Sequence, residues 1–89
     1  MNVKNDVYDP LMSVAKDLNE LDVVLGAKDA SDRIAKIVSA FDETAERISS
    51  ATQSVHDSQE RIEMQKLYRG MIAARRIVLN LQERRSARG

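Results

Sequence analysis

The sequence predicts an all-α protein in which three helices form a coiled-coil-like helical hairpin or a small bundle. Two ladders of apolar residues indicate this fold. The first ladder repeats every seven residues and consists of Ile34, Phe41, Ile48, Val55 and Ile62. The second alternates steps of three and four and consists of Met64, Leu67, Met71, Ala74, Val78 and Leu81. Such spacing forms a seam that is buried against another helix. The change of register between the ladders indicates two helical segments.

The composition points to a small domain that gains stability by association. The 89 residues form one domain at most, with no cysteine for a disulfide or a thiolate metal site and no tryptophan. The aromatic residues are Tyr8, Phe41 and Tyr68. Because large rings supply much of the burial in small cores, we expect the fold to be oligomeric or completed by a partner helix.

The first helix is expected over residues 10–25, after a flexible segment at residues 1–8. Asp9 suits the N-cap, and Pro10 suits the first helical position, where its missing N–H costs nothing. Gly26 suits the end of the helix because glycine enters the left-handed conformation freely. The apolar stripe of this helix consists of Leu11, Val14, Leu18, Leu21 and Leu25.

The second helix is expected over residues 31–54, with Asp29 or Ser31 as its cap. Glu43 and Arg47 lie four residues apart in the acid-first order that stabilises a helix. The stretch 49–54 reads SSATQS and is a weak helix former, because hydroxyl side chains compete for backbone hydrogen bonds. One helix running through this stretch remains an alternative, since the region contains neither proline nor glycine.

The third helix is expected over residues 58–85, after a break at 55–57 and before a flexible end at 86–89. Asp57 followed by Glu60 resembles a capping box. Tyr68, Ile72 and Leu79 widen the apolar stripe on one flank, so this helix is contacted on more than one side. A second chain, or a central place in a three-helix bundle, would satisfy this pattern. Gly70 would permit close approach of a neighbouring helix.

The sequence contains no pattern typical of catalysis, metal binding or a cofactor. His56 is the single histidine, and the three glycines do not form a phosphate-binding loop. The carboxylates fit solvated helix faces rather than an acid–base pair. We therefore expect a protein that is not an enzyme, has no catalytic or metal-binding residue, and requires no cofactor or small-molecule substrate.

The charges are unevenly distributed along the chain. Residues 1–32 hold three lysines against seven acids, whereas residues 64–89 hold seven bases against one acid. The two ends would attract each other in an antiparallel fold, or the basic end would meet an acidic partner. Nucleic acid is a weaker alternative because aromatic residues that stack on bases are scarce. The absence of a long apolar run and of a signal-peptide pattern predicts a cytoplasmic protein without membrane insertion.

Two segments resemble small helical proteins of bacterial type III secretion. They are IAKIVSAFDETAERI at 34–48 and KLYRGMIAARRIVLNL at 66–81. The pattern is similar to that of the CesAB-type and YscE-type chaperones, which hold filament or needle subunits. The resemblance implies a hairpin that sheathes the apolar helix of an export subunit and prevents its early polymerisation. It also implies gripping roles for Phe41, Ile48, Leu67, Met71 and Val78.

We therefore predict a protein-binding module whose partner is a helical protein, another copy of the chain, or both. The expected partner-binding residues are Phe41, Ile48, Met64, Leu67, Tyr68, Met71, Ile72, Val78 and Leu81. A self-assembling needle or rod subunit is an alternative, since the tripeptide 67–69 also resembles the second helix of needle subunits. The chain lacks the proline-containing turn of those subunits. A helical dimer that binds nucleic acid is the third possibility.

Overall fold

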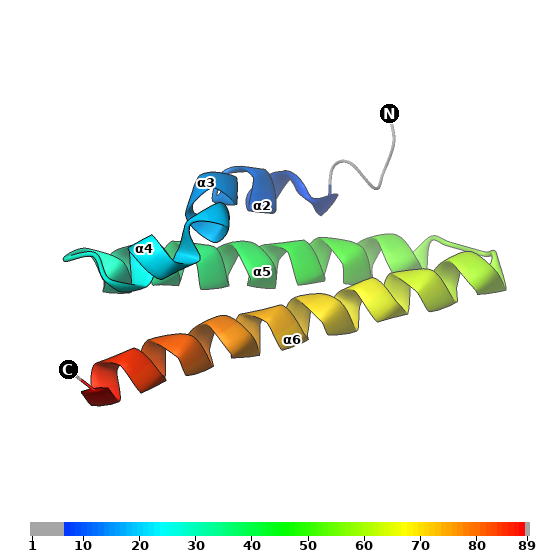
Figure 1. Cartoon of the computed structure of the whole chain (residues 1–89). Coiled ribbons are helices and arrows are strands. Elements are labelled where there is room, and N and C mark those ends of the chain that lie inside the picture. Colours follow the sequence, from blue (N-terminus) through cyan, green and yellow to red (C-terminus); the bar gives the residue numbers. More distant parts are fainter. Residues whose placement is uncertain (1–6, 89) are drawn as a thin grey trace.

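The computed structural model describes residues 7–88, and side chains as far as Ser86; the expectations for residues 1–6 and 89 lie outside this range. The described part is helical and contains no strand, which confirms the all-α helical hairpin (Figure 1). Its helices are α2 (Asp9–Met12), α3 (Ala15–Asn19), α4 (Leu21–Leu25), α5 (Ala30–Gln53) and α6 (Ser58–Arg88).

The long helices α5 and α6 run antiparallel and form the hairpin (Figure 1). Hydroxyl groups mark the end of α5, where Thr52 Oγ1 donates to the Ile48 carbonyl at 2.6 Å and Ser54 Oγ to that of Ala51 at 3.0 Å. At the start of α6, Asp57 Oδ1 accepts a hydrogen bond from the Gln59 N–H at 2.9 Å. Asp57 therefore caps the helix, as predicted, and the chain turns between Gln53 and Ser58.

The prediction of one helix over residues 10–25 is wrong, because three short helices occupy this segment. The chain leaves regular helix at Val14 (φ −115°) and at Glu20 (φ −119°), and Ser13 Oγ donates to the Pro10 carbonyl at 2.7 Å. Val14 and Val24 are both buried. Ten residues apart on one continuous helix, they would point about 80° apart. The breaks allow both side chains to reach the same core.

Several details of the N-terminal segment also differ from expectation. Tyr8, not Asp9, occupies the N-cap position of α2, where its side chain forms no capping hydrogen bond with the described residues, and Asp9 is already helical. Gly26 follows α4 as predicted, but its φ of −94° is right-handed. The guanidinium of Arg85 lies over Gly26, where an added Cβ would meet Nη2 at 2.8 Å. Val7, expected to be in a flexible segment, is buried, and α6 continues to Arg88 instead of ending near residue 85.

The core consists of two clusters along the hairpin. The larger one joins α2–α4 to both long helices and contains Val14, Val24, Ile34, Ile37, Ala40, Phe41 and Val78. The smaller one, nearer the hairpin turn, contains Val7, Ile48 and Met64. The first ladder is thus buried as far as Ile48, whereas Val55 lies in the turn and Ile62 is exposed. The change of register between the two ladders coincides with the end of α5, where the weak helix formers at residues 49–54 predicted a break.

An ion pair fastens the N-terminal segment to α5. Arg33 Nη2 lies 2.7 Å from Asp17 Oδ1, and both side chains are about three-quarters buried. The hydrogen bond from Arg33 lowers the pKa of Asp17 and raises that of Arg33. A partly buried pair of this kind fixes the position of α3 relative to α5.

Candidate partner-binding groove

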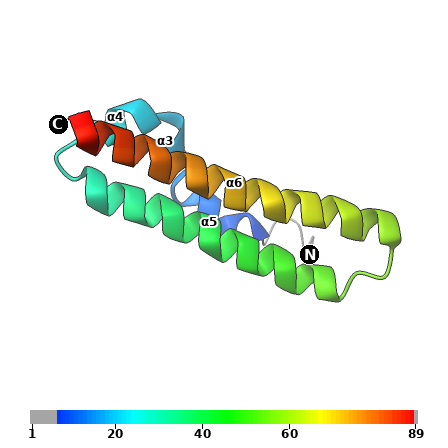
Figure 2. The same cartoon turned by 90° about the horizontal axis from the view of Figure 1, so that it is seen from below.

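One side of the hairpin is left uncovered by α2–α4, and we call it the open face. In Figure 2, α5 and α6 lie side by side while α2–α4 passes behind them. Four depressions lie in a row along this face, and neighbouring depressions share residues of α6. Tyr68 and Arg69 join the first two, Ile72 and Arg76 the next two, and Leu79 and Gln82 the last two. The first and last depressions are lined by both α5 and α6, and the two between them by α6 alone; we call the whole row the groove.

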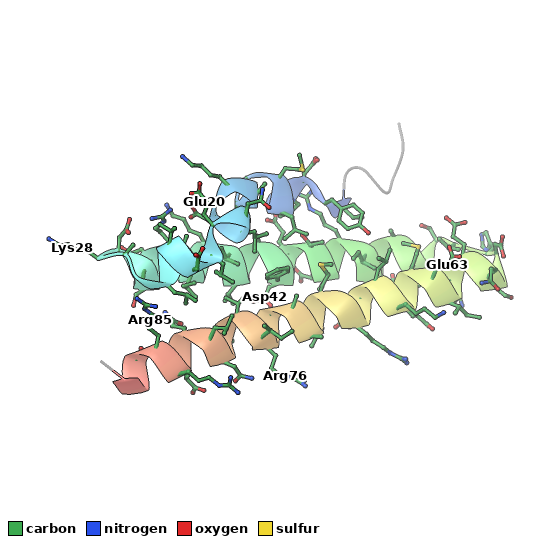
Figure 3. The ribbon with its side chains drawn as sticks, viewed as in Figure 1. Glu20, Lys28, Asp42, Glu63, Arg76 and Arg85 are labelled. Atoms are coloured by element: carbon green, nitrogen blue, oxygen red, sulfur yellow. The ribbon has the colours of Figure 1, made fainter. Side chains whose placement is uncertain are left out.

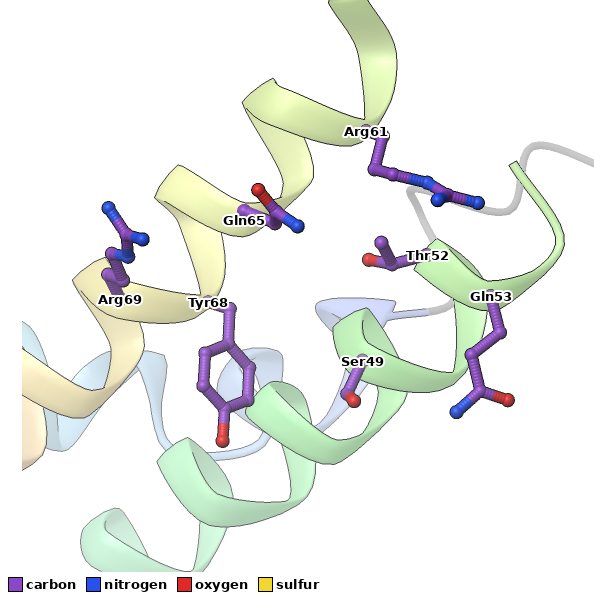
Figure 4. A pocket seen from close by; sticks show the side chains of 7 residues that line it. All are labelled: Ser49, Thr52, Gln53, Arg61, Gln65, Tyr68 and Arg69. Carbon is purple, nitrogen blue, oxygen red and sulfur yellow. The ribbon is translucent and has the colours of Figure 1, made fainter. Parts of the chain in front are cut away.

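The end of the groove near the hairpin turn is polar (Figure 4). It is a depression of about 590 Å³ whose lining residues are Ser49, Thr52, Gln53, Arg61, Gln65, Tyr68 and Arg69. The Tyr68 ring extends from α6 toward α5, and Arg61 extends toward the end of α5. Hydroxyl, amide and guanidinium groups thus line this end, and no carboxylate does.

The rest of the groove is more apolar. Ile72 and Leu79 of α6 are half-buried, and the α5 wall includes Ala35 and Val38. Three serines lie on the same side of α5 (Ser31, Ser39 and Ser49). Tyr68, Ile72 and Leu79 keep part of their surface exposed beside these α5 residues, so a helix laid in the groove would contact them.

The bases of α6 differ in their contacts. Arg75 Nε lies 2.7 Å from Asp42 Oδ1, although its N–H does not point at that oxygen, so the contact is ionic rather than a directed hydrogen bond. Arg61 donates to the Val55 carbonyl at 2.9 Å. Within the described residues, Arg69 and Arg76 form no ion pair, and Arg76 points away from α5 (Figure 3). The groove therefore carries positive charge that its own carboxylates do not balance.

The nine expected partner-binding residues occupy two different environments. Phe41, Ile48, Met64 and Val78 are buried in the chain's own core. Leu67 and Met71 pack against that core, and Leu81 is half-buried. Tyr68, with 40% of its surface exposed, and Ile72 line the groove. The second ladder was interpreted as the contact for another chain, but it faces inward, and the apolar flank beside it faces the groove.

Some groove residues were missing from the expected set. Leu79 shares a flank with Tyr68 and Ile72 at helical spacing, which was a sufficient signal in the sequence. Arg69 and Arg76 lie beside that flank, but the sequence did not show which bases would be paired. Within the described part of the chain no helix approaches Gly70 closely, since nothing lies within 4 Å of a Cβ placed there; a close approach by another chain stays a prediction.

The described residues contain no group of three or more His, Cys, Asp or Glu side chains that could hold a metal ion. Among them, no helix is both long enough and apolar enough to cross a bilayer. The arrangement on the open face is suited to packing and charge pairing with another macromolecule.

Comparison with known proteins gave one family match. Residues 8–84 match the family model described as "Type III secretion system regulatory protein HrpD6". No curated protein and no solved structure gave a significant match. The matched range includes all five described helices except the last residues of α6, and it covers every residue that lines the groove.

Proposed function

The chain belongs to the family of the type III secretion system regulatory protein HrpD6, and from this premise we propose that it binds an amphipathic helix of another secretion component in the groove of its open face. In this role the protein is a non-enzymatic chaperone or co-chaperone that acts in the cytoplasm. The resemblance in the sequence to type III secretion chaperones agrees with the family match at the level of the secretion system. The chaperone role itself rests on the groove.

The apolar flank of α6 is the main support for this function. Tyr68, Ile72 and Leu79 keep part of their surface in water, although the rest of the helix has enough apolar residues to pack the core. They repeat at steps of four and seven along one side of α6. Burying an exposed apolar side chain completely contributes about 1.5–3 kcal/mol of favourable free energy. A partner that completes the burial of these three side chains gains part of this free energy from each of them.

The dimensions of the groove suit a helix. Its lining runs along α6 from Arg61 to Glu83, which is about 33 Å at 1.5 Å per residue, and an 18-residue α-helix extends about 27 Å. A partner helix of about 18 residues would therefore occupy most of it. Apolar anchors at steps of three and four on the partner would meet the α6 flank, which is the usual mode of binding a helix in a groove.

The substitution Ile72→Asp tests the proposal directly. A carboxylate in the middle of the apolar flank should weaken partner binding about tenfold or more, because a charged group replaces the central apolar contact and must lose water when the apolar side of the partner covers it. The matched control is Ile77→Asp, which makes the same change on α6 at a residue that is 58% exposed and lines no part of the groove. Co-purification with the partner from the native host, followed by titration of the purified pair, measures both.

A photo-crosslinking residue at position 72 would identify the partner, and position 12 on α2 is the control because Met12 is exposed outside the groove. We expect one secretion component to be captured at position 72 and not at position 12. Equal binding by the Ile72→Asp and Ile77→Asp variants would contradict the proposal. Filaments of the chain alone, lost in Ile72→Asp, would instead indicate a self-assembling subunit.

A further inference from the structure

We infer that the groove binds its partner helix in one orientation, with acidic side chains of the partner held by Arg61 and Arg69 at the end near the hairpin turn. This inference rests on the proposed function, because it specifies the chemistry and direction of the helix in the same groove. It follows from the unequal distribution of charge between the two ends of the groove.

The turn end of the groove presents two cations without a lining carboxylate. Arg61 and Arg69 line the depression of about 590 Å³ together with neutral polar residues. Both arginines are exposed, and neither forms an ion pair within the described part of the chain. Ser49, Gln65 and Tyr68 add neutral hydrogen-bonding groups around them (Figure 4). These are the groups that recognise a carboxylate.

The opposite end of the groove has a different balance. Asp42 lines it and contacts Arg75, and Glu83 lines the depression around Leu79. Arg76 lines the same depression as Glu83, so the carboxylates and guanidinium groups offset each other at this end. Arg61 and Arg69 are not offset in this way by the described lining of the turn end. Acids on a bound helix would therefore be attracted more strongly at the turn end, and this difference favours one direction for the partner.

The spacing of the arginines specifies the partner further. Arg61 and Arg69 are eight residues apart, which corresponds to about 12 Å along α6. Arg76 follows after seven more residues and extends the same basic edge of the groove (Figure 3). A partner helix lying along α6 would match this row with acidic residues at steps of seven or eight on one flank. Its apolar side would then face Ile72 and Leu79.

Three synthetic 18-residue helical peptides test the inference with the full chain. All three share one leucine stripe. The first peptide carries two glutamates, eight residues apart, near one end, and the second peptide has glutamine at those two positions. The third peptide carries the two glutamates near its other end. A fluorophore placed at the end closer to the glutamates of the first peptide reports binding by anisotropy. A spin label attached to the protein at position 56, near the hairpin turn, quenches a fluorophore that lies close to it. Quenching therefore reports which end of the peptide lies at the turn.

We expect the first peptide to bind about tenfold more tightly than the glutamine peptide at low salt, because two charge-assisted contacts form. Its labelled end should be quenched by the spin label, and the third peptide should bind with reversed direction and its labelled end unquenched. The double variant Arg61→Gln with Arg69→Gln should bind the first and second peptides equally. Arg84→Gln, an exposed α6 arginine outside the groove, should retain the tenfold preference.

Equal binding of the glutamate and glutamine peptides, with both weakened by Ile72→Asp, would overturn the inference and leave the proposed function standing. Failure of every peptide to bind, together with a partner insensitive to Ile72→Asp, would overturn both. A dimer of the chain that Ile72→Asp dissociates and that no peptide displaces would assign the open face to a second copy. That result would also overturn the inference.

Discussion

The two faces of the α5–α6 hairpin differ in how completely they are covered. On the covered face, α2–α4 brings Val14 and Val24 against Ile34 and Ile37, and all four side chains are buried. On the open face, the flank of α6 is met only by short α5 side chains and stays partly in water. The difference shows that α6 carries more apolar surface than its own chain uses. A surface of this kind is where an interaction site is expected.

Charge distinguishes the two faces in the same way. The N-terminal segment supplies carboxylates to α5, where Asp17 pairs with Arg33 at 2.7 Å and Asp9 lies 4.0 Å from Arg47. On the open face, Arg69 and Arg76 receive no such partner from the described residues. The acidic beginning of the chain therefore pairs with arginines of α5 rather than with the basic α6. Among the described residues, no ion pair joins the acidic beginning of the chain to its basic end, so the attraction expected from the charge distribution does not appear as an ion pair.

The largest effect on this comparison should come from Ile37→Ala. Ile37 is fully buried between the covered face and the rest of the core, so the substitution removes burial and leaves a cavity. We expect the free energy of unfolding to fall by about 2–4 kcal/mol, measured by urea denaturation. Ile77→Ala, at a residue exposed on α6, should change it by less than about 0.5 kcal/mol. Similar losses in both variants would mean that the covered face is not the stabilising one.

Thr44→Val should have the next largest effect and should stabilise the protein. Thr44 lies seven residues after Ile37 on the same side of α5 and is fully buried, and no described residue forms a hydrogen bond with its hydroxyl. Replacing that hydroxyl with a methyl group should raise the free energy of unfolding by about 1 kcal/mol. Thr52→Val is the control, because Thr52 donates to the Ile48 carbonyl and should gain nothing. A loss of stability in Thr44→Val would indicate that the hydroxyl is hydrogen-bonded in solution.

Gly70→Ala should give a smaller gain. Gly70 lies within α6, and an added Cβ would meet open space. The gain in helix propensity should raise the free energy of unfolding by about 0.5–1 kcal/mol, measured by thermal and urea denaturation. Gly26→Ala should gain less, since its Cβ would displace Arg85. If Gly70→Ala keeps its stability gain but weakens partner binding, a partner approaches α6 closely on this side as well as in the groove.

The smallest effect should appear in the pH dependence of stability. The hydrogen bond from Arg33 lowers the pKa of Asp17 below its ordinary 3.8. Its contribution to stability is therefore complete above that ordinary pKa and is lost as the pH falls through the lowered value. Asp17→Asn should reduce the dependence of the melting temperature on pH below about pH 4. It should not change partner binding in the groove. An unchanged acid profile would show that the ion pair does not hold α3 in solution.

Much of the fold could be predicted from the sequence. The heptad positions Ile34, Phe41 and Ile48 are buried in α5, and the cap at Asp57 starts α6 after a stretch of weak helix formers. These features are local, because seam spacing and caps depend on residues within one or two turns. The breaks at Val14 and Glu20 were not predicted, since the spacing of Leu11, Val14 and Leu18 fits a continuous helix. The structure places Val14 and Val24 in the same core on either side of the break at Glu20.

The candidate site was predicted only in part, for the same reason. By itself the sequence determined that α6 has an apolar seam with an extra apolar flank and a basic surface. The tertiary structure decided which of these faces inward, because α2–α4 covers one side of the hairpin and leaves Tyr68, Ile72 and Leu79 on the other. The helical period determines the angle between side chains on one helix. Which side of the helix is buried depends on where the neighbouring helices pack, and that is a property of the whole chain.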